Sequence, residues 1–335
     1  MKKILQKIYN GQYLTQKESE RLFKFIIVNK INEMQLSALL MTIKTRGETI
    51  DEIYGAVLSL FKNCKFFPRP KYIFSDIVGT GGCDFHTMNI STATAFVLAA
   101  AGFKIVKHCN YNISSKVGSA NILKSLKIPL NITPNQSRFL LDNYNICFLL
   151  APKYHSSFKL IHKIRANLNT RTIYNILGPL LNPAKPNYTI IGVYNYNLID
   201  PMINLLKKLN YKHAIVVNSD NIDELTLHDI THVAELNNNV ITKYSLTAKD
   251  FGLEPYSKDV LKSGTVTQNA RILKNILQGT KKYIDLEHTV AANVALFLRN
   301  LGFLNLKENT KYALKIIYSG IAYKNLLSIS KSCII

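Results

Sequence analysis

Residues 72–102 read YIFSDIVGTGGCDFHTMNISTATAFVLAAAG, and this stretch is the most informative about the fold class. An apolar run at 72–78 is followed by a segment rich in Gly, Ser and Thr at 79–92, and then by a small-residue apolar run at 93–102. The order predicts a buried strand, a glycine-rich turn and a helix. This is how the strand–helix unit of a parallel sheet begins, so the stretch predicts an α/β fold.

The glycine-rich turn fits neither of two common phosphate-binding motifs. No Lys follows its glycines as a Walker loop requires, and the sixth position counted from Gly79 is acidic where a dinucleotide motif needs Gly. The glycines still permit positive φ and a close approach of backbone to ligand. Unpaired N–H groups around Ser91 and Thr92, at the start of the expected helix, would favour an anion. A tight turn followed by an ordinary Ser/Thr cap explains the segment equally well.

The chain on the N-terminal side of this stretch reads as helices alone. Thr15 with Glu18 and Thr49 with Glu52 have the spacing of capping boxes at the starts of two helices. Gly47 ends the helical pattern between them and is expected to be a left-handed cap.

On the C-terminal side, short apolar runs alternate with helical stretches, which predicts a mostly parallel sheet with helices on both faces. Thr133 and Pro134 look like the cap and first residue of one of these helices. The triplet Asn237–Asn239 is expected to turn a hairpin. We therefore expect a small helical domain at 1–66, completed by helices around 165–185, and a larger α/β domain at 67–335.

Composition limits the class of protein. The 335 residues are 47% hydrophobic, so the chain can bury a large core. Its formal net charge is +21, but the basic residues are scattered, so we expect no nucleic-acid partner; a multiply anionic small substrate would benefit from the positive field. The apolar runs fall short of the roughly 18 residues of a membrane span, and we expect no membrane association.

Cysteine usage indicates a reducing compartment. The five cysteines are odd in number and show no CxxC spacing, so we expect reduced thiols in a cytoplasmic protein. The N-terminal segment has no uninterrupted apolar region of the kind found in secretory signals.

A second polar segment favours a binding site over a simple turn. Residues 107–121 read KHCNYNISSKVGSAN and again lie between an apolar run and a helical stretch. The carboxyl ends of consecutive strands in a doubly wound sheet face one crevice, so the two segments are expected to converge there.

These segments together carry a resemblance to a known family. GTGG…NIST and KHxN…SSKxGS resemble the substrate-binding signature of the anthranilate phosphoribosyltransferase family, and residues 171–183 (RTIYNILGPLLNP) and 222–229 (IDELTLHD) are similar to two further motifs of that family. The likeness runs in order over nearly the whole chain. It implies an α/β fold of the nucleoside phosphorylase/phosphoribosyltransferase type. It also implies transfer of a phosphoribosyl group from phosphoribosyl diphosphate to anthranilate, in tryptophan biosynthesis, usually by a homodimer.

The resemblance implies roles for particular residues. For phosphoribosyl diphosphate they are Gly79, Gly82, Cys83, Thr87, Asn89, Ile90, Ser91, Thr92, Lys107, Asn110, Ser114, Ser115 and Ser119. For anthranilate they are Gly79, Asn110 and Arg165, and for two Mg²⁺ ions per monomer they are Ser91, Asp223 and Glu224. His108 and His155 are expected to line the pocket and Pro179 to shape a wall of it, and no general acid or base is assigned.

The residue types suit this chemistry. Mg²⁺ is a hard cation that prefers carboxylate and phosphate oxygens, so an Asp–Glu pair suits it, and metal charge stabilises a departing diphosphate. The planar fork of Arg165 can bind both oxygens of a carboxylate. Taken alone, however, Arg165 reads as a surface helix residue and the Asp–Glu pair as a solvated turn.

The chain departs from the family pattern in the same loops. Cys83 and Asp84 replace an Asp–Gly pair, Cys109 replaces a Gly and Tyr111 an Arg, while Asn121 replaces a usual aspartate. Loss of a cation near the diphosphate predicts weaker binding of phosphoribosyl diphosphate, and positive φ at position 109 would add strain. Cys83 and Cys109 are also expected to approach each other.

Two other functions remain open at this point. A pyrimidine nucleoside phosphorylase shares the architecture but uses free phosphate and no metal pair. A non-catalytic descendant that acts as a binding protein would explain the altered loops and the net charge.

Overall fold

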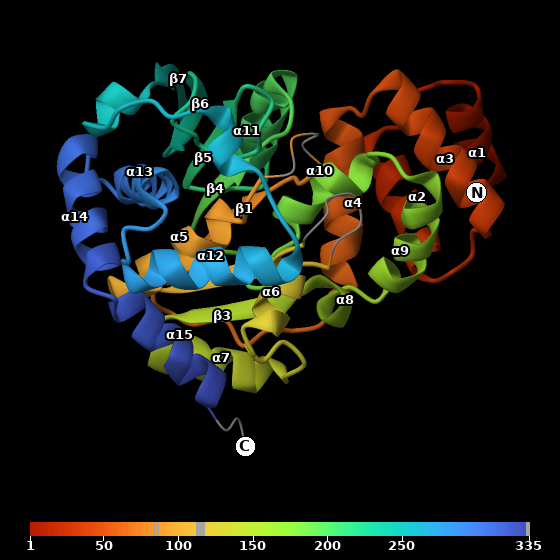
Figure 1. The fold of residues 1–335 in the computed structure, drawn as a ribbon. Coiled ribbons are helices and arrows are strands. Elements are labelled where there is room, and N and C mark those ends of the chain that lie inside the picture. The colour runs from red at the N-terminus through yellow and green to blue at the C-terminus, as the bar shows by residue number, and fades with distance from the viewer. Residues whose placement is uncertain (83–84, 86, 112–117, 333–335) are drawn as a thin grey trace.

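The computed structural model describes residues 1–82, 85, 87–111 and 118–332 (Figure 1). Its strands are β1 (Ser75–Gly79), β2 (Ile105–Cys109), β3 (Ile146–Leu150), β4 (Tyr188–Gly192), β5 (His213–Ser219), β6 (Thr231–Asn237) and β7 (Val240–Leu246). The helices are α1 (Lys2–Tyr9), α2 (Gln16–Ile27), α3 (Glu33–Arg46), α4 (Ile50–Lys62), α5 (Ile90–Ala100), α6 (Ser119–Ser125), α7 (Pro134–Tyr144), α8 (Ala151–Tyr154), α9 (Ser157–Leu168), α10 (Ile173–Leu180), α11 (Ile199–Lys208), α12 (Val266–Gln278), α13 (Ile284–Asn300), α14 (Leu306–Tyr318) and α15 (Ile321–Lys331).

The described strands form one seven-stranded sheet in the order β3-β2-β1-β4-β5-β6-β7. Neighbouring strands from β3 to β5 are parallel, and β6 and β7 continue the sheet as an antiparallel edge. The predicted mostly parallel sheet is therefore confirmed. β2, the next strand in the chain, pairs with one side of β1, and β4 pairs with its other side. The carboxyl ends of β1 and β4 therefore form the switch point where such sheets bind ligands.

Two layers of helices cover the sheet (Figure 1). Side chains alternate between its faces: Ile190 packs in the core formed with α5 and α12–α15, whereas Ile191 packs in the core that the sheet shares with α11 and the N-terminal helices. The helices α9 and α10 contribute to that second core as well. We propose a domain boundary between residues 66 and 67, with α9 and α10 counted as part of the helical domain.

Local sequence signals place several helix ends and the hairpin. Both predicted capping boxes are present at the starts of α2 and α4, and Thr133 caps α7 with Pro134 in its first turn. Asn238 and Asn239 turn the hairpin between β6 and β7 with φ of 46° and 70°. Gly47 ends α3 with φ 83° and ψ 150°, so the predicted left-handed helical cap is wrong, although the positive φ still favours Gly.

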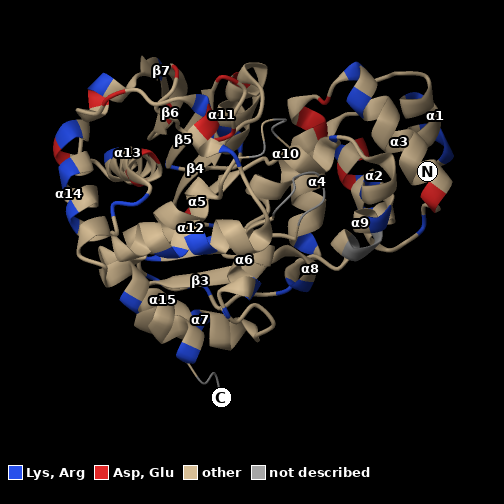
Figure 2. Cartoon of the chain, viewed as in Figure 1, with Lys and Arg blue, Asp and Glu red and all other residues tan. Residues whose placement is uncertain are grey.

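Surface and core features bear on partners. The apolar side chains Leu36, Leu39, Leu40 and Ile43 of α3 are buried in the core of the chain itself. Lys and Arg residues are spread over helices on both sides of the sheet in the view of Figure 2. Among the described residues, every helix is too short or too polar to span a lipid bilayer.

Candidate active site

Glycines at two strand ends admit the acidic segment to the site. A Cβ on Gly79, the last residue of β1, would lie 2.2 Å from Asp223 Oδ2, and one on Gly192, the last residue of β4, would lie 1.7 Å from the Asp223 carbonyl oxygen. Gly81 and Gly82 follow with φ of 66° and 76°. The segment that carries Asp223 therefore crosses directly over the switch point of the sheet because side chains are absent there.

The acidic pair is tied to the glycine loop and to the start of α5. The N–H of Gly81 donates to Asp223 Oδ2 at 2.7 Å, and the N–H of Ser91 donates to Glu224 Oε1 at 3.3 Å. The N–H of Thr92 donates to the carbonyl of Asn89 at 3.1 Å. The N–H groups at positions 91 and 92, expected to be unpaired and free for an anion, are thus already bonded, one of them to a carboxylate that the helix terminus favours.

Burial dominates the electrostatics of this cluster. It raises the pKa of Glu224 to about 8, with repulsion from Asp223 as the second cause. It also lowers the pKa of Lys107, against the attraction of Asp76 and Glu224. Lys107 Nζ donates to Ser91 Oγ at 3.2 Å and to the carbonyl of Ile77. The Lys107 amine is thus held next to Ser91, whose N–H binds Glu224.

The helices α1–α4, α9 and α10 are together called the helical layer, and the sheet with its remaining helices the α/β layer. The helical layer supplies another wall of the site. Arg165 of α9 is 5% exposed, and its Nη2 donates to Asn175 Oδ1 at 2.9 Å, while its Nε has no hydrogen-bond partner within the described part of the chain. Burial lowers the pKa of Arg165 to about 10, which leaves the guanidinium charged at neutral pH. A buried arginine with an unused donor suits an anionic ligand such as a carboxylate.

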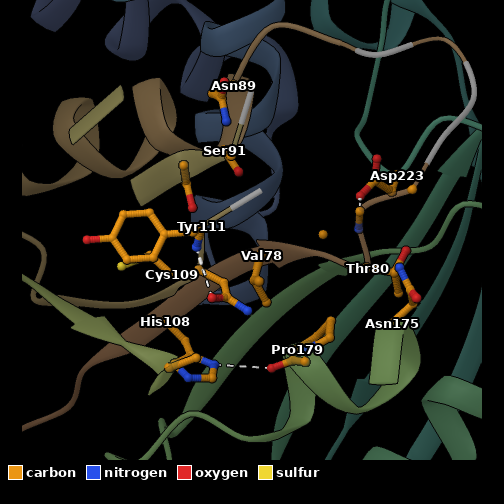
Figure 3. Close-up of a pocket in the computed structure, with 18 of the residues that line it drawn as sticks. Val78, Thr80, Asn89, Ser91, His108, Cys109, Tyr111, Asn175, Pro179 and Asp223 are labelled. Atoms are coloured by element: carbon orange, nitrogen blue, oxygen red, sulfur yellow. Dashed lines mark hydrogen bonds between the residues drawn. The ribbon is translucent and has the colours of Figure 1, made fainter. Parts of the chain in front are cut away.

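One cavity of about 210 Å³ joins these parts. Figure 3 shows Asn89 and Ser91 on one side of it, Asp223 on another, and His108 with Pro179 along a third. The predicted residues that line it are Gly79, Gly82, Thr87, Asn89, Ser91, Lys107, His108, Asn110, Ser119, Arg165, Pro179, Asp223 and Glu224.

Some predicted residues lie elsewhere. Ile90 and Thr92 are fully buried in the first turn of α5 and do not line the cavity, because their side chains point into the core of the α/β layer. His155 is buried behind the cavity, where its Nε2 lies 2.9 Å from the Leu181 carbonyl. The predicted contacts of Cys83, Ser114 and Ser115 fall outside the described residues, as does the expected approach of Cys83 to Cys109.

The altered position 109 carries no backbone strain. Cys109 is the last residue of β2, is absent from the residues with positive φ, and donates to the Leu149 carbonyl at 3.6 Å. Burial raises the pKa of its thiol to about 12, so the thiol is protonated at neutral pH. The strain expected for a Gly replacement at this position does not arise.

Several site residues were not predicted individually. Asn175 Oδ1 accepts from both Arg165 and the Thr172 N–H, and Arg171 Nε donates to the Gly82 carbonyl at 2.6 Å. Both residues lie inside the 171–183 motif, so the signal was present, but their partners are distant in sequence. Gly192 had no signal beyond its place at the end of an apolar run.

The donor set fits a divalent cation. The carboxylates of Asp223 and Glu224 and the Ser91 hydroxyl line one cavity, the Ser91 N–H is bonded to Glu224, and Asn89 Oδ1 is buried without a hydrogen-bond partner in the described part of the structure. Oxygen donors of this kind are those that Mg²⁺ prefers. The raised pKa of Glu224 reflects a burial cost that a bound cation would offset.

Comparison with known proteins defines the class first. Residues 2–64 match the family model described as "Glycosyl transferase family, helical bundle domain", and residues 71–323 match "Glycosyl transferase family, a/b domain". The chain is therefore built as a glycosyltransferase of this two-part type.

Individual relatives are more specific. The chain is 51% identical to anthranilate phosphoribosyltransferase of Buchnera aphidicola subsp. Schlechtendalia chinensis over 99% of this chain and 100% of that protein. It superposes on the anthranilate phosphoribosyltransferase of Thermus thermophilus with a TM-score of 0.90 at 29% identity, covering 98% of each chain. The Saccharomyces cerevisiae enzyme in complex with PRPP and Mg matches with a TM-score of 0.86 at 25% identity, over 94% of this chain and 92% of that one. The chain belongs to the anthranilate phosphoribosyltransferase family.

Proposed function

We propose that this protein transfers the 5-phosphoribosyl group of phosphoribosyl diphosphate to the amine of anthranilate, releasing diphosphate, as a step of tryptophan biosynthesis. The observation that carries the proposal is the single cavity that joins the glycine loop, the Asp223–Glu224 pair and the buried Arg165. Family membership supports it, and so do two structures of the yeast relative, one with PRPP and Mg and one with 4-fluoroanthranilate.

The two substrates would be held by different layers. In the α/β layer, Lys107, Asn110, Ser119 and the glycine loop would bind the phosphoribosyl diphosphate. Asp223 and Glu224, with Ser91, would hold Mg²⁺, which when bound neutralises charge on the departing diphosphate. We propose two ions per monomer.

In the helical layer, the Arg165 guanidinium would bind the anthranilate carboxylate, with Asn175 fixing its orientation. The amine of anthranilate is neutral at pH 7 and can attack without a general base, so the protein mainly positions the reactants.

The alternatives account for less. A nucleoside phosphorylase uses free phosphate and leaves the acidic pair without a role. A non-catalytic binding protein does not need Arg165 buried opposite the acidic pair across one cavity.

A fluorescence assay of phosphoribosyl-anthranilate formation tests the proposal. We expect turnover with anthranilate, phosphoribosyl diphosphate and Mg²⁺, and its loss in EDTA. Asp223→Asn and Glu224→Gln should each lower kcat/KM at least about a hundredfold, because each removes a negative donor from the cation site. Metal-independent cleavage of a pyrimidine nucleoside by phosphate would instead establish the phosphorylase function.

We further propose a cytoplasmic homodimer. Exposed apolar side chains on the helical layer, among them Tyr13 and Met34 at 55% and 81% exposure, provide contact area for a second copy. Sedimentation of the purified protein at micromolar concentration would give the mass of a dimer if the proposal holds and that of a single chain if it does not.

A further inference from the structure

A second cavity lies at the end of the sheet opposite the candidate active site, where the parallel strands begin. Its walls include Tyr188 and His213, the first residues of β4 and β5, and the α4 residues Tyr54 and Phe61. It therefore lies between the helical layer and the amino ends of the strands, whereas the candidate active site opens at their carboxyl ends.

Both linkers that join the helical and α/β layers line this cavity. Arg69 and Ile73 come from the segment between α4 and β1, and Lys185 to Asn187 come from the segment between α10 and β4. Arg69 lies between two prolines, and Pro186 follows Lys185, so both segments are locally stiff. The Asn187 N–H donates to the Phe74 carbonyl at 3.1 Å, which ties one linker to the other.

The charged groups of the described lining are all basic. They are Lys62, Arg69, Lys185 and Lys212, and no Asp or Glu stands among the described residues of the wall. Burial, and then Lys212, lower the pKa of His213, so its ring is neutral at pH 7. Lys62 is paired with Glu20 at 2.5 Å, whereas Arg69, Lys185 and Lys212 form no salt bridge with any residue that the structure describes. Three cations without a salt-bridge partner among the described residues are thus gathered around one hollow, which favours an anion there.

Aromatic rings provide the rest of the wall. The Tyr188 and His213 rings stack with centroids 4.7 Å apart and planes at 11°, and Lys185 Nζ lies 4.8 Å from the centre of the Phe61 ring. Flat rings bordered by cations suit a planar ligand that carries negative charge.

We propose that this cavity is a second ligand site, which binds a small planar aromatic molecule carrying a phosphate or carboxylate group. Because such a ligand would contact both linkers at once, its binding would restrain the movement of one layer against the other. The site is distinct from the proposed substrate cavity and does not depend on the proposed reaction.

The chain contains no Trp, so Phe61→Trp would place its sole indole in this cavity. Phenyl phosphate is the probe, with inorganic phosphate and phenol as probes of charge and ring alone. We expect phenyl phosphate to cause a saturable change in indole fluorescence. Phosphate and phenol should each bind with an affinity at least tenfold lower. Adding Arg69→Gln and Lys185→Gln to the reporter should weaken binding at least tenfold, whereas adding Lys243→Gln, which alters a surface lysine of β7, should leave it unchanged.

Hydrogen exchange of the unmodified protein provides a readout that does not depend on the reporter. Phenyl phosphate should slow amide exchange at 63–74 and 181–187 together. The proposal is overturned if phenyl phosphate gives no saturable fluorescence change, if the Arg69 and Lys185 substitutions leave the affinity unchanged, or if neither linker gains protection.

Discussion

Glycine at positions 79 and 192 leaves the space that the Asp223 segment occupies. Each glycine ends a parallel strand at the switch point, and neither contributes a functional group. Their role is steric: they allow the carboxylate of Asp223 to reach the N–H of Gly81. The geometry of the acidic pair thus depends on two residues that carry no side chain.

Gly79→Ala should therefore lower the free energy of unfolding by about 2 kcal/mol, because its methyl group would overlap Asp223. Gly178→Ala is the control: outside its own helix backbone and chain neighbours no atom lies within 4 Å of the added methyl, so its cost is limited to the crowding that a side chain before Pro179 meets. Urea unfolding measures both. A Gly79 variant as stable as the Gly178 variant would show that the segment shifts without cost.

His108 should make stability depend on pH. Burial, and then the neighbouring His155, lower the pKa of His108 from 6.5 to about 3. Below pH 6.5 the unfolded chain takes up a proton that the folded protein refuses, so stability falls as the pH drops, by up to about 1.4 kcal/mol per unit. Between pH 7 and 5, His108→Asn should lose about 2 kcal/mol less than the parent protein in urea unfolding. Equal losses in the two proteins would contradict the assignment.

Tyr111 should limit the binding of phosphoribosyl diphosphate. It lines the cavity at 37% exposure, where the family motif carries Arg. Tyr111→Arg should lower the KM for phosphoribosyl diphosphate roughly fivefold, equivalent to about 1 kcal/mol, by adding a cation. Tyr111→Gln, which adds no charge, should not lower it. Steady-state kinetics at saturating anthranilate separate the two outcomes.

Motif resemblance singled out site residues that spacing alone did not. Arg165, Asp223 and Glu224 read as surface residues on spacing alone and were assigned by resemblance, and the structure brings them to one cavity. Asn175 and Gly192 were missed because their importance lies in contacts with Arg165 and Asp223 that are distant in sequence. Spacing along a chain does not encode such pairs.

Among the elements, the first turn of α4 carries a carboxylate, that of Glu52, which serves two purposes. Glu52 closes the predicted capping box with Thr49, and it is also buried against Arg46 and accepts the Leu14 N–H at 2.9 Å. It thus joins the start of α4 to the end of α3 and to the loop after α1. The capping role was predictable from local spacing, whereas the ion pair required the three-dimensional packing.

Glu52→Gln should lower the free energy of unfolding by about 3 kcal/mol, because Arg46 would be left buried without its counter-charge. Glu33→Gln breaks an exposed pair with Lys163 and should cost less than about 0.5 kcal/mol. Urea titration of both variants provides the measurement. A loss of under about 1 kcal/mol at Glu52 would show that water or a neighbouring group compensates Arg46.

Element ends were the most predictable part of the fold. Thr15, Thr49 and Thr133 act on backbone within three residues, so their signals are local and complete. The conformation of Gly47 was not predictable, because positive φ is compatible with more than one ψ and the following chain chooses between them. The α/β class followed from the alternation of elements, but strand order did not, since it depends on which faces each helix buries.

At the scale of the whole molecule, the helical layer and the sheet share one core. Leu40 of α3 and Val216 of β5 belong to the same cluster of buried side chains. The helical layer therefore cannot unfold without exposing a face of the sheet, and calorimetry should show one transition. Glu52→Gln should move that transition to lower temperature without dividing it. Two resolved transitions would mean that the layers are energetically separate.

Arg165 stands on one layer and Asp223 on the other, with the cavity between them. If the proposed function holds, each reactant is bound by a different layer. A slight rotation of one layer then changes the distance between the amine and the sugar, while the contacts that bind each reactant are kept. The turnover rate and the substrate affinities can therefore change independently. Substitutions in the two linkers (63–74 and 181–187) would alter how often the amine and the sugar are aligned, and substitutions in either wall would alter how tightly each reactant binds.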